Sequence, residues 1–350
     1  MADWRPQLDS TSWKAYADDP LPGWARRSGA LFDVESARLE TAQPCDVAIC
    51  SVPWDTTAST RIGARTGPAA IREASIAYSA QANSRGRTEL LNLRTGRLLR
   101  PRSRQIRDFG DLHTYPSDTE RQLHATAAEV FAIGLIADQV IALGGEHTVS
   151  HPLYAGLQRA LQTRHPGSRL GYVQIDHHFD FGDHSILHGR HYHGSNGRRI
   201  SELDGVEPAM MAFVGMGDIT SAKQLAGMRD SGIAVRTMMD VREHGFSACL
   251  ADACRHVLQA CDHLYVSIDI DVCDLSVSPG TGHVTVGGIG AVDFLSIADV
   301  LRPLPVFALD IVEINGLLDP SGTTAHLAAR LLFELLLLEA SEPSVDAPRG

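Results

Sequence analysis

The stretch LGYVQIDHHFD, residues 170–180, places a short apolar run directly before a cluster of acidic and imidazole side chains. A run of about six apolar residues bounded by polar ones is typical of a strand buried in a parallel sheet. In an open parallel sheet, ligands bind just beyond the carboxyl ends of the strands. The stretch therefore predicts a buried strand and indicates on which side of it the chemistry is expected.

The same alternation runs through most of the chain. Short apolar runs predict further buried strands at residues 47–52, 140–143, 211–214, 264–268 and 306–311. Apolar residues at helical spacing predict helices at residues 68–81, 117–137, 151–163, 248–260, 291–301 and 324–338. Strands that alternate with helices favour an α/β fold of three layers, α/β/α, with a mostly parallel central sheet. Residues 89–116 fit this rhythm poorly and predict either a hairpin insertion or one strand with loops.

Composition indicates a globular chain without a nucleic-acid or membrane partner. The 350 residues are 44% hydrophobic and 21% charged, and their formal net charge is −11. Nucleic acids and anionic membranes bind basic surfaces, so an acidic chain matches neither well. The N-terminal MADWRPQLDS lacks the pattern of a secretory signal, and no apolar run reaches the ~20 residues of a membrane span. The six cysteines form no C-x-x-C pair, so we expect free thiols in a cytoplasmic protein.

The chain is expected to form one large domain with two short ends. Residues 1–45 have little periodicity and carry three of the four tryptophans, so we expect an N-terminal arm that packs on the body or on a neighbouring subunit. Residues 46–340 form the predicted catalytic domain, and residues 341–350 a flexible polar tail.

Three more predicted strands end in residues of the same chemical kinds. GGEHTVS, with His147, follows one strand, and DIDVCD, with Asp269 and Asp271, follows another. DIVEIN, with Asp310 and Glu313, ends a third. One such motif alone is usually a turn or a pair of solvated carboxylates. Four of them at the ends of four buried strands favour one shared site at a single edge of the sheet.

The spacing of these residues predicts a binuclear metal site. Side chains at i, i+2 and i+4 of an extended segment share one face, which applies to Asp176, His178 and Asp180. The predicted ligands are His147, Asp176, His178, Asp180, Asp269 and Asp271. Four carboxylates match two divalent cations, and oxygen-rich ligation with imidazole suits Mn²⁺, with Ni²⁺, Co²⁺ and Fe²⁺ as alternatives. Two such ions that share a water lower its pKa and provide hydroxide near neutral pH.

Taken together, the motifs resemble those of the ureohydrolase family, which includes arginases and agmatinases. The family pieces are G-G-[D/E]-H-[S/T], D-A-H-x-D, H-G-T, S-x-D-x-D-x-x-D-P with P-G-T-G, and D-x-x-E-x-N. They stand here at residues 144–148, 176–180, 193–195, 267–274 with 279–282, and 310–315. RIGARTGPAAIREAS, residues 61–75, resembles a motif of the agmatinase branch. The resemblance implies an arginase-like fold and a trimeric or hexameric assembly, homo- or hetero-oligomeric.

The resemblance also implies a role for each residue of the site. One metal would be bound by His147, Asp176, Asp180 and Asp269, and the second by His178 and Asp271, with Asp176 and Asp269 bridging. His193 would carry the proton to the leaving amine. Glu313, together with Asp310, would bind the substrate guanidinium. A metal-bridging hydroxide would attack the guanidinium carbon, and urea and an amine would be released.

Departures from the family pattern lie in loops expected to surround the distal end of the substrate. His177 replaces an alanine, and His283 replaces the threonine after P-G-T-G. Gly217 stands where an arginine is common. Gly182 stands where arginases have an asparagine that contacts the amino-acid end of arginine. Because the six predicted ligands are intact, we expect the metal chemistry to be retained with a different substrate.

The departures and residues 61–75 argue against arginine as the substrate. We predict a small or unusual guanidine: guanidine itself, a guanidino acid, a substituted guanidine or a biguanide such as metformin. Agmatine is the alternative, which residues 61–75 favour. The additional histidine beside the ligands, His177, makes Ni²⁺ an alternative to Mn²⁺.

Two other classes of protein fit parts of the pattern. A degenerate subunit that supports an active partner would have lost some ligands, whereas all six stand here, together with His193 and Glu313. A deacetylase on the related fold would use one zinc ion and fewer aspartates, which the complete D-x-H-x-D and S-x-D-x-D motifs disfavour.

Overall fold

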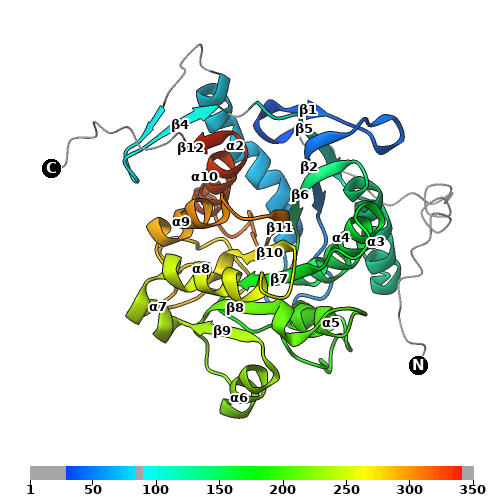
Figure 1. Cartoon of the computed structure of the whole chain (residues 1–350), viewed down its shortest axis with the longest axis vertical. Helices are drawn as coiled ribbons and strands as arrows, with labels where there is room; N and C mark the ends of the chain where they lie inside the picture. The colour runs from blue at the N-terminus through cyan, green and yellow to red at the C-terminus, as the bar shows by residue number, and fades with distance from the viewer. Residues whose placement is uncertain (1–28, 84–89, 102, 341–350) are drawn as a thin grey trace.

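Nine strands form one parallel sheet through the centre of the molecule (Figure 1). The computed structural model describes residues 29–83, 90–101 and 103–340. Every pair of neighbouring strands in this sheet is parallel. In spatial order the strands are β1 (Glu35–Ser36), β5 (Ile106–Asp111), β2 (Cys45–Val52), β6 (Ala137–Gly144), β11 (Val306–Val312), β10 (His263–Asp269), β7 (Leu170–Ile175), β8 (Met211–Met216) and β9 (Ala234–Thr237).

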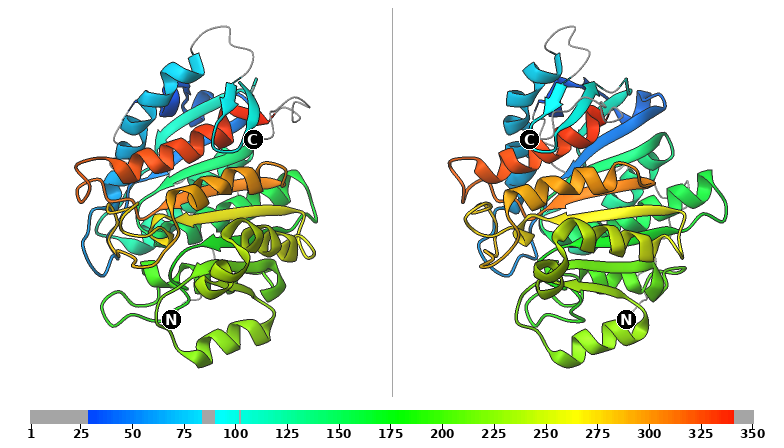
Figure 2. Two further views of the ribbon diagram at one scale, coloured as in Figure 1. Left: turned by 90° about the vertical axis from the view of Figure 1, so that its left-hand side faces the viewer. Right: turned by 60° about the vertical axis from the view of Figure 1, so that its left-hand side comes forward.

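Helices cover both faces of this sheet and form the outer layers (Figures 1 and 2). One face carries α2 (Gly67–Asn83), α7 (Met238–His244), α8 (Phe246–Val257), α9 (Ala291–Leu301) and α10 (Thr323–Leu336). The other carries α3 (Thr119–Gly134), α4 (Ser150–Arg164), α5 (Asn196–Ser201) and α6 (Ala222–Ser231). Each helical layer joins the sheet through its own apolar core. The predicted three-layer α/β/α fold with a mostly parallel sheet is confirmed.

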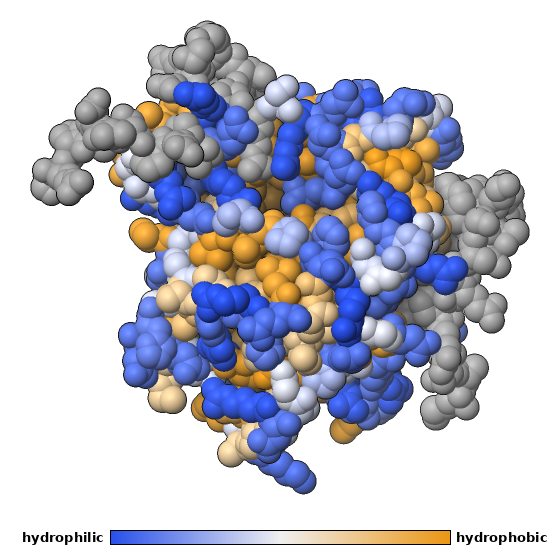
Figure 3. All heavy atoms as spheres, in the orientation of Figure 1, coloured by the Kyte–Doolittle hydropathy of each residue, from blue (hydrophilic) through white to orange (hydrophobic). Residues whose placement is uncertain are grey.

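The apolar runs become strands because both of their faces are buried. In β7, Val173 and Ile175 belong to one core, whereas Leu170 and Tyr172 belong to the other. Side chains alternate along a strand, so a strand between two helical layers needs apolar residues at every position. Burial of one such side chain contributes about 1.5–3 kcal/mol. On the face drawn in Figure 3, hydrophobic residues gather near the middle of the view, where Figure 1 draws α8, α9 and β10.

The segment at 89–116 contains both structures that its sequence left open. The hairpin β3 (Leu90–Asn92) and β4 (Arg97–Pro101) pairs with β12 (Leu338–Ala340) in a small antiparallel sheet. The next strand, β5, joins the central sheet. The predicted strands did not include β1, β9 or β12, which are short or polar. Their pairing is decided by their neighbours rather than by their own composition.

The described chain begins with residues that pack on the body. Leu31 and Phe32 are buried, and the Leu31 N–H donates to Asp108 Oδ2 at 2.8 Å. The three tryptophans of the expected arm and the expected tail at 341–350 lie outside the described residues. The domain boundaries at residues 45 and 340 therefore stay predictions.

Two expectations about compartment can be compared with the described residues. Their helices include none with the length and apolar character needed to cross a membrane. The six cysteines are buried free thiols. The cytoplasmic location stays a prediction.

Candidate metal centre

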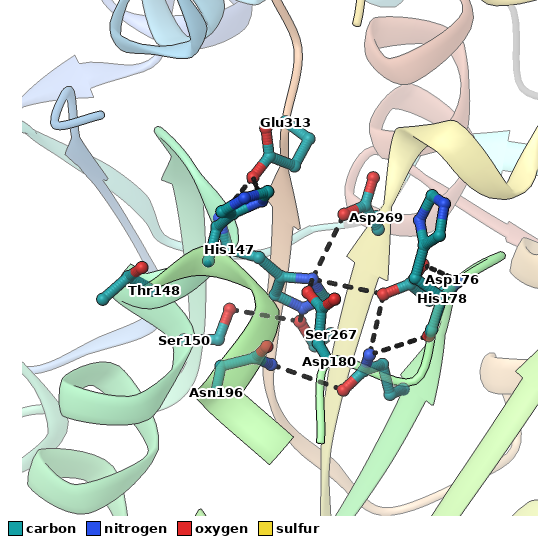
Figure 4. Close-up of polar contacts among 12 residues, drawn as sticks. His147, Thr148, Ser150, Asp176, His178, Asp180, Asn196, Ser267, Asp269 and Glu313 are labelled. Carbon is teal, nitrogen blue, oxygen red and sulfur yellow. Dashed lines mark hydrogen bonds and ion pairs between the residues drawn. The ribbon is translucent and has the colours of Figure 1, made fainter. Parts of the chain in front are cut away.

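Four adjacent strands, β6, β11, β10 and β7, end at the same edge of the sheet. Their register keeps these ends level, because Ser267 of β10 pairs with both Asp310 of β11 and Gln174 of β7. The loops that follow therefore bring their first polar side chains together. Figure 4 shows those side chains converging on one region.

The first cluster gathers three carboxylates around one imidazole nitrogen. His147 Nδ1 lies 3.3 Å from Asp176 Oδ2 and 3.0 Å from Asp180 Oδ2. The same nitrogen lies 3.1 Å from Asp269 Oδ2. One ligand atom from each of the four residues lies within 4.8 Å of the others, and three of the four residues are buried. This arrangement is suited to one divalent cation with a nitrogen and oxygen ligand set.

The second cluster shares Asp176 with the first. Asp176 Oδ2 faces His147, whereas its Oδ1 lies 3.6 Å from His178 Nδ1. Asp271 Oδ2 completes this cluster at 3.1 Å from the same His178 nitrogen. Asp269, the second predicted bridge, stands in the first cluster, and its Oδ1 accepts the Asp271 N–H at 2.9 Å. The geometry thus gives the two clusters one carboxylate in common.

Buried charge makes this group of carboxylates suited to cations. Burial and the charges of Asp271 and Asp176 raise the pKa of Asp269 well above its usual range. Burial, followed by the charge of Asp176, raises the pKa of Asp271 to about 7. Burial also opposes the charge of Asp176, but hydrogen bonds with His147 and His178 lower its pKa. Among the described residues, Asp271 Oδ1 is buried with no hydrogen-bond partner. The residues therefore fit the predicted pair of divalent cations.

The Nε2 atom of His147, which faces away from the carboxylates, is part of a chain of hydrogen bonds. His147 Nε2 lies 2.9 Å from Ser267 Oγ, and that hydroxyl donates to Asp310 Oδ1 at 2.6 Å. Tyr265 donates to the other oxygen of Asp310. The sequence predicts that Asp310 binds substrate, but its carboxylate has no exposed surface and is occupied by these hydroxyls. Its place in the structure is behind His147, where it orients the ring so that Nδ1 faces the carboxylates.

Glu313 is held in a strained conformation beside the first cluster. Its φ of 64° lies in the left-handed region, as does the φ of 44° at Asp180. For a residue other than glycine this conformation costs about 1–3 kcal/mol and is common at functional sites. The Glu313 N–H donates to Gly145 O at 2.8 Å, and its Oε1 accepts the His147 N–H at 2.8 Å. Figure 4 shows the carboxylate next to His147.

His193 lies between Glu313 and the loop that follows β2. Its Nδ1 is 3.7 Å from Glu313 Oε1, and its Nε2 accepts the Ser59 N–H at 3.3 Å. Ser59 Oγ lies 2.8 Å from the same Nε2. Burial lowers the pKa of His193. Because Nε2 accepts the Ser59 N–H, the neutral form of the ring carries its proton on Nδ1. Ser59, which the sequence analysis did not single out, thus decides which nitrogen holds the proton.

Glu146 is a second residue that the sequence analysis did not assign. Its Oε1 accepts the Thr57 N–H at 3.1 Å, and its own N–H donates to Trp54 O at 2.9 Å. Burial raises the pKa of Glu146 to about 8. These bonds join the loop after β2 to the residue next to His147. Glu146 is part of the GGEHT motif, but a carboxylate next to a predicted ligand has no spacing that would mark it as functional.

The chain is similar to known proteins over most of its length. Residues 45–338 match the Arginase family. Guanidinopropionase of Pseudomonas aeruginosa is 32% identical over 305 residues, which cover 86% of this chain and 89% of that protein. Mitochondrial agmatinase of Gallus gallus is 29% identical over 311 residues, covering 85% and 82%. The solved proclavaminate amidino hydrolase of Streptomyces clavuligerus superposes with a TM-score of 0.72 at 25% identity, covering 89% and 97%.

The layered sheet and the carboxylates and imidazoles at its strand ends define a ureohydrolase, a hydrolase that acts on C–N bonds of linear amidines. The chain belongs to the Arginase family, whose match covers nearly all of the described residues. The predicted family and its arginase-like fold are therefore confirmed. The family implies a guanidino substrate. The names of the two relatives differ in the distal group of that substrate, so the family leaves this group open.

Proposed function

We propose that this chain hydrolyses the guanidino C–N bond of a small or unusual guanidine with the help of two divalent metal ions, releasing urea and an amine. The observation that carries the proposal is the pair of ligand clusters that share Asp176, with Glu313 and His193 beside them. His147, Asp176, Asp180 and Asp269 would hold one ion, and Asp176, His178 and Asp271 the other. Bound there, two divalent ions would lower the pKa of a shared water enough to supply a nucleophile.

Residues of the chain itself account for substrate binding and proton transfer. A carboxylate binds a planar guanidinium through paired N–H donors, which is the role we assign to Glu313. Its Oε2 is the oxygen left for the substrate, because Oε1 accepts the His147 N–H. His193 holds a proton on Nδ1, the nitrogen that faces Glu313 at 3.7 Å. A neutral imidazole N–H is a very weak acid, so the ring would first take up the proton that the attacking water loses. The resulting imidazolium would then protonate the amine that leaves when the C–N bond breaks.

The donor set favours Mn²⁺ as the native ion. Carboxylate oxygens outnumber imidazole nitrogens in both clusters, and oxygen ligands suit Mn²⁺. Ni²⁺ stays the alternative, because imidazole binds it well and His177 adds a third ring beside the ligands. Metal content after loading with each ion separately, together with the activity of each form, decides between them.

Agmatine is the second candidate substrate, and Asp218 is the observation that favours it. Asp218 Oδ2 lies 4.0 Å from His178 Nε2 and its side chain is 59% exposed, so it is a carboxylate at the edge of the site. A carboxylate there suits a cationic distal group such as the second amine of agmatine. The same charge disfavours the distal carboxylate of a guanidino acid.

The test is urea release from a panel of guanidino compounds by protein loaded with Mn²⁺ or Ni²⁺. The panel runs from guanidine and methylguanidine through dimethylbiguanide and 4-guanidinobutyrate to agmatine. We expect one or more small guanidines to give the highest kcat/KM, and Asp271→Ala to abolish turnover and lower the metal content. Agmatine as the best substrate would favour the second candidate. If neither metal form releases urea, the proposal fails, and a supporting-subunit role or turnover of acetylated amines becomes the next hypothesis.

The assembly of the chain stays a prediction. We propose a trimer or hexamer, formed by this chain alone or with a partner, from the family resemblance. Light scattering of the purified chain measures its mass directly, and a stable monomer with full activity would contradict the proposal.

A further inference from the structure

Rings from neighbouring segments fill the space beside two unusual glycines near the metal centre. A Cβ at Gly182 would lie 2.0 Å from the Tyr192 hydroxyl oxygen. A Cβ at Gly217 would lie 2.2 Å from Cε1 of His177 and 2.7 Å from its Nδ1. The asparagine and the arginine of the family pattern could therefore stand at these two positions only if the rings of Tyr192 and His177 moved. The ring of Tyr192 thus occupies the space beside Gly182, and the ring of His177 occupies the space beside Gly217.

A third departure places a ring directly on the proposed proton donor. The imidazoles of His283 and His193 are stacked, with centroids 5.7 Å apart and planes 21° from parallel. His283 also meets His178 edge-on, with centroids 5.6 Å apart. One exposed side chain thus touches both the proton donor and a predicted metal ligand. The threonine of the family pattern is too short to cover both rings.

The backbone that carries His283 is held in place. Arg61 donates from Nε to Gly282 O at 3.0 Å and from Nη2 to Thr281 O at 2.9 Å. A Cβ at Gly282 would lie 3.8 Å from Glu313 Oε2, the oxygen that we assign to the substrate. The segment before His283 therefore runs along the guanidinium-binding carboxylate, and its position is fixed by the loop after β2.

We propose that His283 is a specificity-determining residue that limits the substrate to guanidines with short substituents. The inference rests on the proposed function, in which His193 protonates the leaving amine. A proton donor must lie beside the amine that it protonates, so a ring stacked on His193 lies beside the substituent that this amine carries. His283 narrows that side of the site, while Tyr192 and His177 fill the places from which other side chains would hold a longer distal group.

The test compares the wild type with His283→Thr and His283→Ala on a ladder of guanidines. The ladder is guanidine, methylguanidine, n-butylguanidine, 4-guanidinobutyrate and agmatine. We expect the ratio of kcat/KM for n-butylguanidine to that for methylguanidine to rise about 10-fold or more in both variants, because one or more methylene groups gain room. His283 is exposed, so its replacement is expected to leave the melting temperature and the metal content unchanged.

The controls separate selectivity from other effects. His244→Thr changes an exposed histidine on α7, outside the site, and should leave the ratio as in the wild type. An equal fall of kcat for every compound, with a shifted pH profile, would mean that His283 only positions His193 and would overturn the inference.

If the metal-loaded wild type releases no urea, calorimetric titration of the same ladder replaces kinetics. Tighter binding of n-butylguanidine by His283→Thr supports the inference, whereas equal affinities for wild type and variant refute it.

Discussion

At the scale of single residues, the site depends on side chains in which two polar atoms have different partners. His147 turns Nδ1 to three carboxylates, while its Nε2 is oriented through Ser267 by the buried Asp310. Glu313 accepts a backbone N–H with one oxygen and keeps the other for a ligand. Such residues are sensitive to small changes, because a ligand moved by about 1 Å no longer meets its partner in the required geometry.

Glu313→Gln tests the substrate carboxylate. The amide keeps the size of the side chain but removes the charge that pairs with a guanidinium, so we expect kcat/KM to fall about 100-fold or more. Metal content should stay near that of the wild type, because Glu313 stands in neither ligand cluster. Urea release and elemental analysis of the same samples measure both. Wild-type activity in this variant would refute the assignment.

At the scale of elements, the site exists because strand ends approach one another closely. A Cβ at Gly145, just after β6, would lie 1.9 Å from the carbonyl oxygen of Trp54 in the loop after β2. That contact is with backbone, which cannot rotate away as a flexible side chain can. Glycine at this position therefore lets two adjacent strand ends approach and puts His147 within reach of the carboxylates.

Gly145→Ala is expected to force these loops apart. Overpacking of this kind costs about 1–3 kcal/mol, and here it should also weaken metal binding, because His147 is two residues away. Gly227→Ala on α6 is the matched control, since a Cβ there meets no atom within 4 Å and alanine favours a helix by about 0.5–1 kcal/mol. Thermal melting and metal titration of both variants check the prediction. Equal behaviour of the two would contradict it.

Arg72 shows that a residue in a family-like motif can serve the scaffold. Its guanidinium lies 2.8 Å from Asp108 Oδ1 and 3.2 Å from Asp111 Oδ1, all three side chains being buried. It thus ties α2 to β5. Arg72→Ala would leave buried carboxylates unpaired, so we expect a loss of about 3–5 kcal/mol of unfolding free energy. Metal affinity of the folded fraction should be unchanged. Chemical denaturation measures the first quantity, and a loss below 1 kcal/mol would show that the pair is solvated.

At the scale of the whole molecule, the metal centre couples folding to pH and to cations. The pKa of Asp271 is raised to about 7 in the folded chain from an ordinary value of 3.8. The folded state then binds more protons than the unfolded state between those values, so unfolding free energy falls as pH rises through this window. The raised pKa of Asp269 acts in the same direction, whereas the lowered pKa of Asp176 affects stability only below its ordinary value of 3.8, outside this window.

We therefore expect the raised pKa values of Asp271 and Asp269 to lower the unfolding free energy of the metal-free protein from pH 5 to pH 8. Burial lowers the pKa of His151 and of His191, which acts in the opposite direction, so the carboxylate contribution is measured as the difference between the wild type and Asp271→Asn. Divalent ions should reverse the trend at pH 8, because they bind the ionised carboxylates of the folded state. Asp271→Asn should reduce the pH dependence of the metal-free form. Melting curves with a chelator and with Mn²⁺ test this, and an effect of Asp271→Asn on the metal-free melting temperature that is the same at pH 5 and pH 8 would contradict the coupling.

The sequence by itself determined the layers and the composition of the site. A strand buried on both faces needs apolar residues throughout, and this local requirement can be recognised in runs such as residues 170–175. The ends of parallel strands meet at one edge, so the motifs after four such runs indicate the residues of the two clusters from the sequence alone. Short edge strands such as β1 and β9 were not predicted, because their pairing depends on neighbours distant in the sequence.

Only the tertiary structure decided which atoms face one another. It set Asp310 behind His147, gave the clusters Asp176 in common, and brought Ser59 to the far nitrogen of His193. It also put the ring of His283 on that of His193. Spacing along a chain reports which face of a strand a residue occupies, whereas a side-chain contact depends on loop conformation and on the packing of segments far apart in sequence.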